Sequence, residues 1–168
     1  MFEYDRQITR TLHDEHLVTI SVLERLEAVF QKYGPKKVPG GDNPEITSLL
    51  GDISHLVECD VKNHFAFEEG RLFPLLAALG DSPISQILTG EHNVILPLGN
   101  LLSELAKIAK TDGFNEASWL QFRQSGAALI ERMISHIQKE EMALLPMLED
   151  IVEEDDDAAL LMDYLQMS

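Results

Sequence analysis

Histidine and glutamate recur in one spacing that occurs twice in the chain. The segments that begin at His64 (HFAFEEGRLFPLL) and at His136 (HIQKEEMALLPML) align without gaps at an offset of 72 residues. They share six identical residues, where ordinary residue usage would give about one. Upstream, the Glu-His dipeptide at 15–16 matches the one at 91–92. The chain therefore contains two copies of one unit, each with two histidines and a glutamate four residues after the second histidine.

The repeated residues are of the kinds that bind metal ions. Helix residues four apart point to the same side, so each His-x-x-x-Glu pair directs an imidazole and a carboxylate together. All six lie on apolar helix stripes, where unpaired polar or charged groups are costly to bury. No Lys or Arg shares these stripes, so a cation is expected to balance the glutamates. The candidate metal ligands are His16, His64, Glu68, His92, His136 and Glu140.

Four imidazoles and two carboxylates, related by an approximate twofold axis, fit two metal ions better than one. We expect each ion to take one histidine from each helix of a unit, and the two glutamates to bridge the pair. This ligand type favours iron first and manganese second, and it leaves positions open for water or a diatomic ligand. Zinc usually prefers a closed tetrahedral set or a single open site. The alternative is a bundle with four structural core histidines and two surface glutamates.

Several neighbours of these residues have open roles. Glu69 and Glu141 directly follow the predicted glutamate ligands and either bridge the metals or hydrogen-bond the ligands. His13 is an alternative ligand, a hydrogen-bond partner of a ligand, or a partly exposed histidine. His55 and Cys59 form another pair four residues apart that suits a soft metal, but His55 lies off the apolar stripe.

Clusters of Gly, Pro and Asn divide the chain into four long segments with the apolar periodicity of helices. These helices are expected at about 5–33, at 44–80, from 83 after the Ser82-Pro83 start signal, and from about 116. Pro74 predicts a kink or an end, and Pro97 predicts a bend. The fold class is therefore all-α: an antiparallel up-down-up-down four-helix bundle built from two repeated helical hairpins, plus a short C-terminal helix.

Residues 1–150 form the predicted bundle domain, and 151–168 form an acidic C-terminal helix or tail. An acidic run such as the one at 153–157 is most often a solvated helix face. The apolar residues after it either dock on the bundle or bind a second copy or a partner protein; they are Leu160, Leu161, Tyr164 and Leu165.

The composition excludes several classes of function. With 29 acidic and 13 basic residues, the formal net charge of −16 would repel nucleic acid and an anionic membrane surface. No run approaches the ~18 apolar residues of a membrane helix, and the N-terminus has no apolar signal region. The single cysteine, Cys59, excludes an internal disulfide framework and Cys-rich metal sites. We expect a cytoplasmic protein that binds neither nucleic acid nor membrane.

With these residues in place, the chain resembles the hemerythrin-like family of HHE cation-binding domains over about residues 5–150. The resemblance rests on the Glu-His dipeptides at 15–16 and 91–92 and on the two His-x-x-x-Glu-Glu segments, each followed by a Leu and a Pro. Two positions depart from the oxygen-carrying hemerythrins. Leu96 stands where they have a second histidine, and Glu140 follows its histidine by four residues where they have an Asp at five. The ligand set is more similar to bacterial iron-cluster repair proteins and eukaryotic iron-sensing hemerythrin domains.

The resemblance implies two non-haem iron ions, Fe2+ or Fe3+, with an oxo or hydroxo bridge, in the core of the bundle. It also implies binding or sensing of oxygen, nitric oxide, peroxide or iron, so a small diatomic ligand such as O2 or NO is the expected partner. We interpret the chain as a metal- and ligand-binding protein rather than an enzyme. The alternatives are a di-iron enzyme acting on peroxide or nitric oxide, an iron donor for iron–sulfur cluster repair, and an interaction module with a structural metal.

Overall fold

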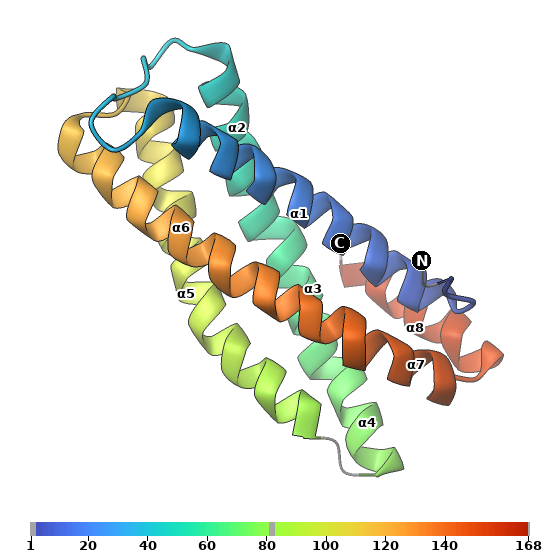
Figure 1. Ribbon diagram of the computed structural model, residues 1–168. Helices are drawn as coiled ribbons and strands as arrows, with labels where there is room; N and C mark the ends of the chain where they lie inside the picture. Colours follow the sequence, from blue (N-terminus) through green and yellow to red (C-terminus); the bar gives the residue numbers. More distant parts are fainter. Residues whose placement is uncertain (1–2, 81–82, 168) are drawn as a thin grey trace.

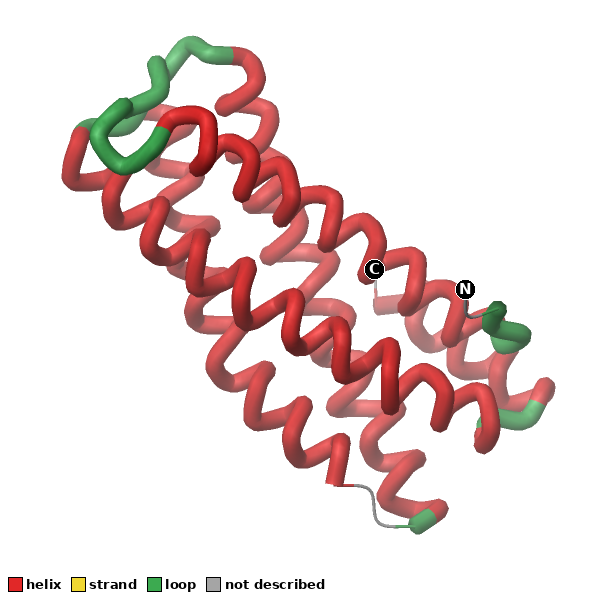
Figure 2. The backbone as a smooth tube through the Cα atoms, in the orientation of Figure 1, coloured by secondary structure: helices red, strands yellow, loops and turns green. Residues whose placement is uncertain are grey.

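The computed structural model describes residues 3–80 and 83–167. Four long helical rods form an antiparallel bundle, and a shorter helix packs beside it near the chain termini (Figure 1). The predicted all-α four-helix bundle with an added C-terminal helix is confirmed. Apart from short loops, Figure 2 shows only helix in the described part of the chain.

Two of the rods are single helices, and π-helical turns divide the other two into shorter segments. The single helices are the first rod, α1 (Gln7–Tyr33), and the third, α5 (Pro83–Asp112). The second consists of α2 (Pro44–His55), η1 (Leu56–Val61), α3 (Lys62–Phe67), η2 (Glu68–Leu72) and α4 (Phe73–Leu79). The fourth consists of α6 (Glu116–Lys139), η3 (Glu140–Leu144) and α7 (Leu145–Ile151), and α8 (Glu154–Met167) completes the chain.

Side-chain caps fix two of the predicted helix starts. The Asn43 side chain accepts a hydrogen bond from the Glu45 backbone N–H at 3.0 Å, directly before α2. Asn115 and Ser118 form a reciprocal capping box at the start of α6. The third rod begins at Pro83 as predicted, and Ser82 of its start signal lies outside the described residues.

The second rod does not end at Pro74, and the fourth continues past Pro146 in the same way. Both prolines instead follow π turns at equivalent places, η2 and η3, and each π turn begins at the glutamate of the repeat. A π turn adds one residue to a helical turn and is frequent at functional sites. Helix α5 remains α-helical through Pro97. The repeated glutamates therefore sit where the helix geometry changes.

A layer of buried polar residues divides the core into two hydrophobic clusters. The cluster toward α2 contains Leu26, Ile53 and Trp119, and the one toward α8 contains Leu12 and Leu144. On each rod, the predicted metal ligands lie between residues of these two clusters. The polar layer therefore lies in the interior of the bundle.

The acidic C-terminal segment is a helix and docks on its own bundle. Leu160 and Tyr164 of α8 are buried, and α8 packs against α1 and α3. Asp157 is also buried, contrary to the expected solvated face: its carboxylate accepts hydrogen bonds from the backbone N–H groups of Gln7 (2.8 Å) and Ile8 (2.9 Å). The first turn of α1 has unpaired N–H groups that no side chain of its own N-cap satisfies, so Asp157 supplies the cap.

Over residues 3–80 and 83–167, none of the helices combines the length and the apolar character that a bilayer crossing requires.

Candidate metal centre

All six predicted ligands point into the polar layer. They come from the four rods, and each is at most 6% exposed. The structure brings them together in two groups whose ligand atoms lie within 4.8 Å of one another. One group contains Glu68, His92, His136 and Glu140, and the other contains His16, His64 and Glu140.

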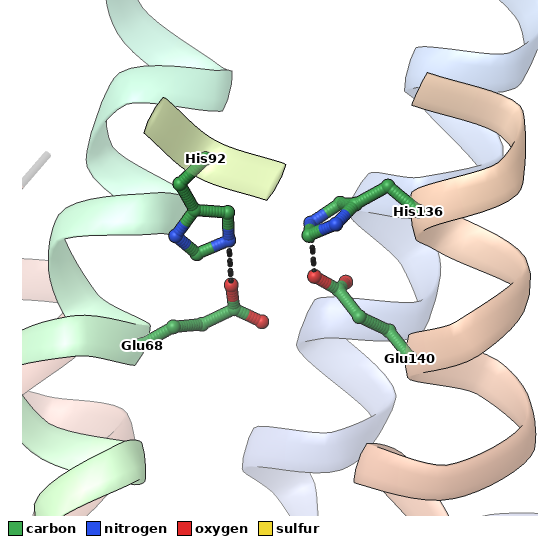
Figure 3. A group of neighbouring side chains, drawn as sticks. All are labelled: Glu68, His92, His136 and Glu140. Carbon is green, nitrogen blue, oxygen red and sulfur yellow. Dashed lines mark ion pairs between the residues drawn. The ribbon is translucent and has the colours of Figure 1, made fainter. Parts of the chain in front are cut away.

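The two carboxylates lie between two pairs of histidines. Oε1 of Glu140 is 2.5 Å from Nε2 of His136, while Oε2 is 2.5 Å from Nε2 of His16. The Glu68 oxygens face His64 and His92, each at 3.2 Å from Nε2. Figure 3 shows Glu68 and His92 facing Glu140 and His136 across the core. Each carboxylate therefore places one oxygen toward each histidine pair, which is the geometry of a bridging ligand.

Four further glutamates surround this inner group, one for each histidine. The Nδ1 atoms lie 2.6–2.8 Å from carboxylate oxygens, in the pairs His16–Glu141, His64–Glu15, His92–Glu69 and His136–Glu91. The glutamate before a histidine contacts the second histidine of its own hairpin. The glutamate after a ligand glutamate contacts the other hairpin. We call these four the outer glutamates.

The contacts of the outer glutamates decide which ring nitrogen faces the core. A carboxylate beside Nδ1 holds the proton there, so the neutral imidazole turns the lone pair of Nε2 inward. Among the described residues, the buried atoms without a hydrogen-bond partner include all four Nε2 atoms and both oxygens of Glu68 and Glu140. Lone pairs therefore face lone pairs at 2.5–3.5 Å. Such an arrangement is costly unless protons or metal cations lie between these atoms.

Electrostatics in the core favours positive charge. Burial lowers the pKa of His16 and His136, but their close contacts with Glu140 and with an outer glutamate outweigh this effect and raise it. The pKa of His64 is raised well above its usual value, because the charge of Glu68 and contacts with Glu140 and Glu15 outweigh burial. Burial alone would raise the pKa of Glu140, yet contacts with three histidines hold it well below its usual value.

Little positive charge is available from the protein itself. The inner and outer glutamates together are six carboxylates around four imidazoles. Among the described residues, Lys139 is the only Lys or Arg that forms an ion pair with one of them, at 2.5 Å from Glu91. Two divalent or trivalent cations would supply the missing charge, and the eight inward-facing nitrogen and oxygen atoms are ligand types that iron and manganese accept.

A third layer holds two of the outer glutamates. The Tyr164 hydroxyl, from α8, donates to Glu15, and the Tyr4 hydroxyl donates to Glu141 at 3.0 Å. His13 contacts Glu141 through Nδ1 at 2.9 Å, with about a third of its side chain exposed. Of the three alternatives predicted for His13, the partly exposed histidine matches the structure, and its ring contacts an outer glutamate. Residues from both ends of the chain support the histidines of one pair.

His55 and Cys59 take no part in this centre. The His55 side chain is 71% exposed and lies 3.9 Å from Asp60, and Cys59 is partly exposed. Neither belongs to the two groups of described residues whose ligand atoms lie close enough together to hold a metal ion.

A small cavity of about 20 Å³ lies beside the inner group. The side chains of His16, His64 and His136 line it together with apolar residues, which include Phe65 and Met133. A space of this size holds about one water molecule. Phe67 and Phe73 do not line this cavity and belong to the hydrophobic cluster toward α8. The cavity can therefore admit a water-sized ligand to the His16 and His64 side of the centre.

The outer glutamates are the functional candidates that sequence reasoning resolved least. It left Glu69 and Glu141 between two roles and gave no role to Glu15 and Glu91. The repeated Glu-His dipeptide was the available signal, because both hairpins keep a glutamate directly before the first histidine.

Comparison with known proteins gives one family match. The model described as the hemerythrin HHE cation binding domain matches residues 7–148, and a second, overlapping match covers 84–166. The first match spans the four rods of the bundle, and the second spans the second hairpin together with α8. The search of curated proteins returned no match.

Proposed function

Because the chain belongs to the hemerythrin HHE cation-binding family, we propose that its six inner side chains hold two iron ions and that this centre binds a small ligand such as O2, NO or peroxide. One ion would take His16 and His64, and the other His92 and His136. Glu68 and Glu140 would give one oxygen to each. The observation that carries the proposal is the set of eight buried nitrogen and oxygen atoms without hydrogen-bond partners, divided between two positions.

The ligand types favour iron over zinc. Two imidazoles and two shared carboxylate oxygens at each position suit a metal that accepts mixed nitrogen and oxygen ligands and more than four of them. Zinc sites more often have a closed tetrahedral set or one open position. Iron held by four protein donors keeps positions at which a diatomic ligand can bind.

The protein's own residues prepare the centre for that ligand. The outer glutamates hold the Nδ1 protons, which fixes the ring orientations and makes each Nε2 a more basic metal ligand. The hydrophobic clusters on both sides exclude bulk water. The cavity of about 20 Å³ has room for a water-sized molecule and none for a large organic substrate. These features support a sensor, carrier or buffer of a small ligand rather than an enzyme with a bulky substrate.

Metal analysis tests the proposal directly. Protein expressed with iron available is expected to contain two iron ions per chain by elemental analysis, and its near-ultraviolet absorption should change when the reduced protein meets air. The control is Glu131→Gln, which changes an exposed glutamate on α6 away from the six inner residues. An iron content far below two ions per chain, or a different metal in its place, would contradict the proposal. Steady turnover of peroxide would favour the enzyme instead.

Replacing Tyr164 with Phe should weaken one metal position more than the other. The change keeps the aromatic ring, which packs 4.8 Å from the ring of Phe67, but removes the hydroxyl that holds Glu15. Glu15 in turn orients His64. Because outer contacts of this kind typically contribute 10- to 100-fold to metal affinity, and Tyr164 acts one step further out, we expect up to about tenfold weaker binding.

Chelator competition measures this effect. One ion should be removed from Tyr164→Phe at lower chelator concentration than from the unmodified protein, while the other ion is removed at the unchanged concentration. Equal weakening of both ions would show that the hydroxyl acts on the whole fold rather than through Glu15.

A further inference from the structure

Helix α5 carries an exposed apolar stripe with a seven-residue period. Its four large exposed apolar residues are Ile87 (49% exposed), Val94 (45%), Leu101 (42%) and Ile108 (54%). Half-buried apolar residues lie between them at alternating spacings of three and four; these are Ile84, Leu98 and Leu105. The positions form a heptad pattern over the length of α5, interrupted only by Glu91. A pattern of this kind is typical of a helix that packs against another helix.

The same face lacks charge. Charged residues make up 25% of the chain, and the formal net charge is −16. Between Pro83 and Ser103, however, every exposed residue is uncharged; they are Pro83, Gln86, Ile87, Gly90, Asn93, Val94, Pro97, Asn100 and Leu101. Protein interfaces are distinguished by depletion of charged residues at their centre, whereas free surfaces carry many. The first two thirds of α5 therefore have the composition of an interface.

We propose that this α5 face packs against the α5 face of a second copy of the chain, around a twofold axis. Twofold symmetry brings the same surface from both copies together, so the surface must be complementary to itself. A heptad stripe whose exposed residues carry no charge from Pro83 to Ser103 meets this condition. Most other surfaces of a chain with a net charge of −16 would repel their own copy, and this neutral face offers no acidic cluster to a basic partner.

The size of the face predicts a reversible dimer. The stripe from Ile84 to Ile108 spans about 37 Å, and a helix face about 10 Å wide gives an area on the order of 400 Å² per copy. The total of roughly 800 Å² is in the size range of weak, transient complexes, so a weak and reversible dimer is expected. Helix α8 packs on α1 and α3, whereas α5 packs on α2 and α6 (Figure 1). A second copy can therefore pack on α5 while α8 stays docked on its own bundle.

Sedimentation equilibrium of the full chain from 1 to 500 μM tests the proposal. We expect a monomer–dimer equilibrium that strengthens as salt rises, because salt screens the repulsion between two acidic copies. Leu101→Glu should weaken the dimer at least 30-fold. The matched control is Leu120→Glu, which places the same charge at a 46% exposed leucine on α6 outside the stripe, and it should leave the dimer intact.

Three results would overturn the proposal. They are a monomer throughout the concentration range, a dimer unaffected by Leu101→Glu, and equal weakening by both variants. Circular dichroism and metal content check that each variant folds. If Leu101→Glu does not fold, Val94→Gln tests the same stripe with a smaller change, and it should weaken the dimer without altering metal content. Because the stripe contains none of the six inner residues, failure of this proposal leaves the proposed metal centre untouched.

Discussion

Glu140→Gln is expected to abolish tight binding of both metal ions. A single glutamate has this effect because its two oxygens face different histidine pairs, with Oε1 near His136 and Oε2 near His16 and His64. Glutamine keeps the shape but loses the charge, and its amide nitrogen is a poor ligand. Outer contacts alone contribute 10- to 100-fold, so loss of this bridging carboxylate should weaken binding by about 100-fold or more at both positions. Metal titration under chelator competition measures the loss.

The same variant separates loss of metal from loss of folding. In the metal-free protein, contacts with three histidines hold the pKa of Glu140 well below its usual value, so removal of its charge also removes a stabilising contact. We expect the melting temperature of Glu140→Gln to fall in both iron-loaded and chelator-treated preparations, and the increase that iron gives the unmodified protein to be lost. A variant that merely folds poorly would still melt higher with iron than with chelator. Glu141→Gln is the matched control, and it should weaken mainly the ion beside His16.

The sequence could predict the inner residues because their orientation is a property of single helices. His136 and Glu140 are four residues apart, which places both on one side of α6 and η3 whatever the other rods do. Helix spacing alone does not predict the role of Glu141, because one residue further along the helix turns its side chain by 100°, off the apolar stripe. In the structure Glu141 points to a neighbouring rod, where it contacts His16, 125 residues away in the chain. The relative rotation of rods decides such contacts, and no local spacing encodes it.

The C-terminal helix also makes a contact that local sequence spacing does not predict. The acidic run predicted a solvated face, and most of it is exposed. Asp157 is the exception, because α8 docks where the unpaired N–H groups of Gln7 and Ile8 need an acceptor. The sequence also does not predict the π turns at Glu68 and Glu140. Pro74 and Pro146 indicate only that the α-helix is interrupted, and they do not indicate that a wider turn replaces it.

Metal removal should reverse the pH dependence of stability. In the metal-free protein, the pKa values of His16, His64 and His136 are raised by folding, so the folded state binds more protons than the unfolded state. Stability is then fully present below the unfolded histidine pKa of about 6.5 and is lost as pH rises through the folded values. Each additional bound proton contributes a slope of about 1.4 kcal/mol per pH unit. The lowered pKa of Glu140 has the opposite sign, but its contribution is lost only below about pH 4.5.

Metal-loaded protein should show the opposite trend over the same range, because protons compete with metal ions for the Nε2 atoms and loading tightens as pH rises. Between pH 6 and 8.5, we therefore expect the melting temperature to fall for chelator-treated protein and to rise or stay level for loaded protein. The gap between the two curves should widen by several degrees per pH unit. His136→Gln should flatten the falling curve, while His55→Gln, at an exposed histidine outside the centre, should leave it unchanged. Parallel curves would mean that the buried histidines hold neither protons nor metal, and the proposed centre would lose its electrostatic basis.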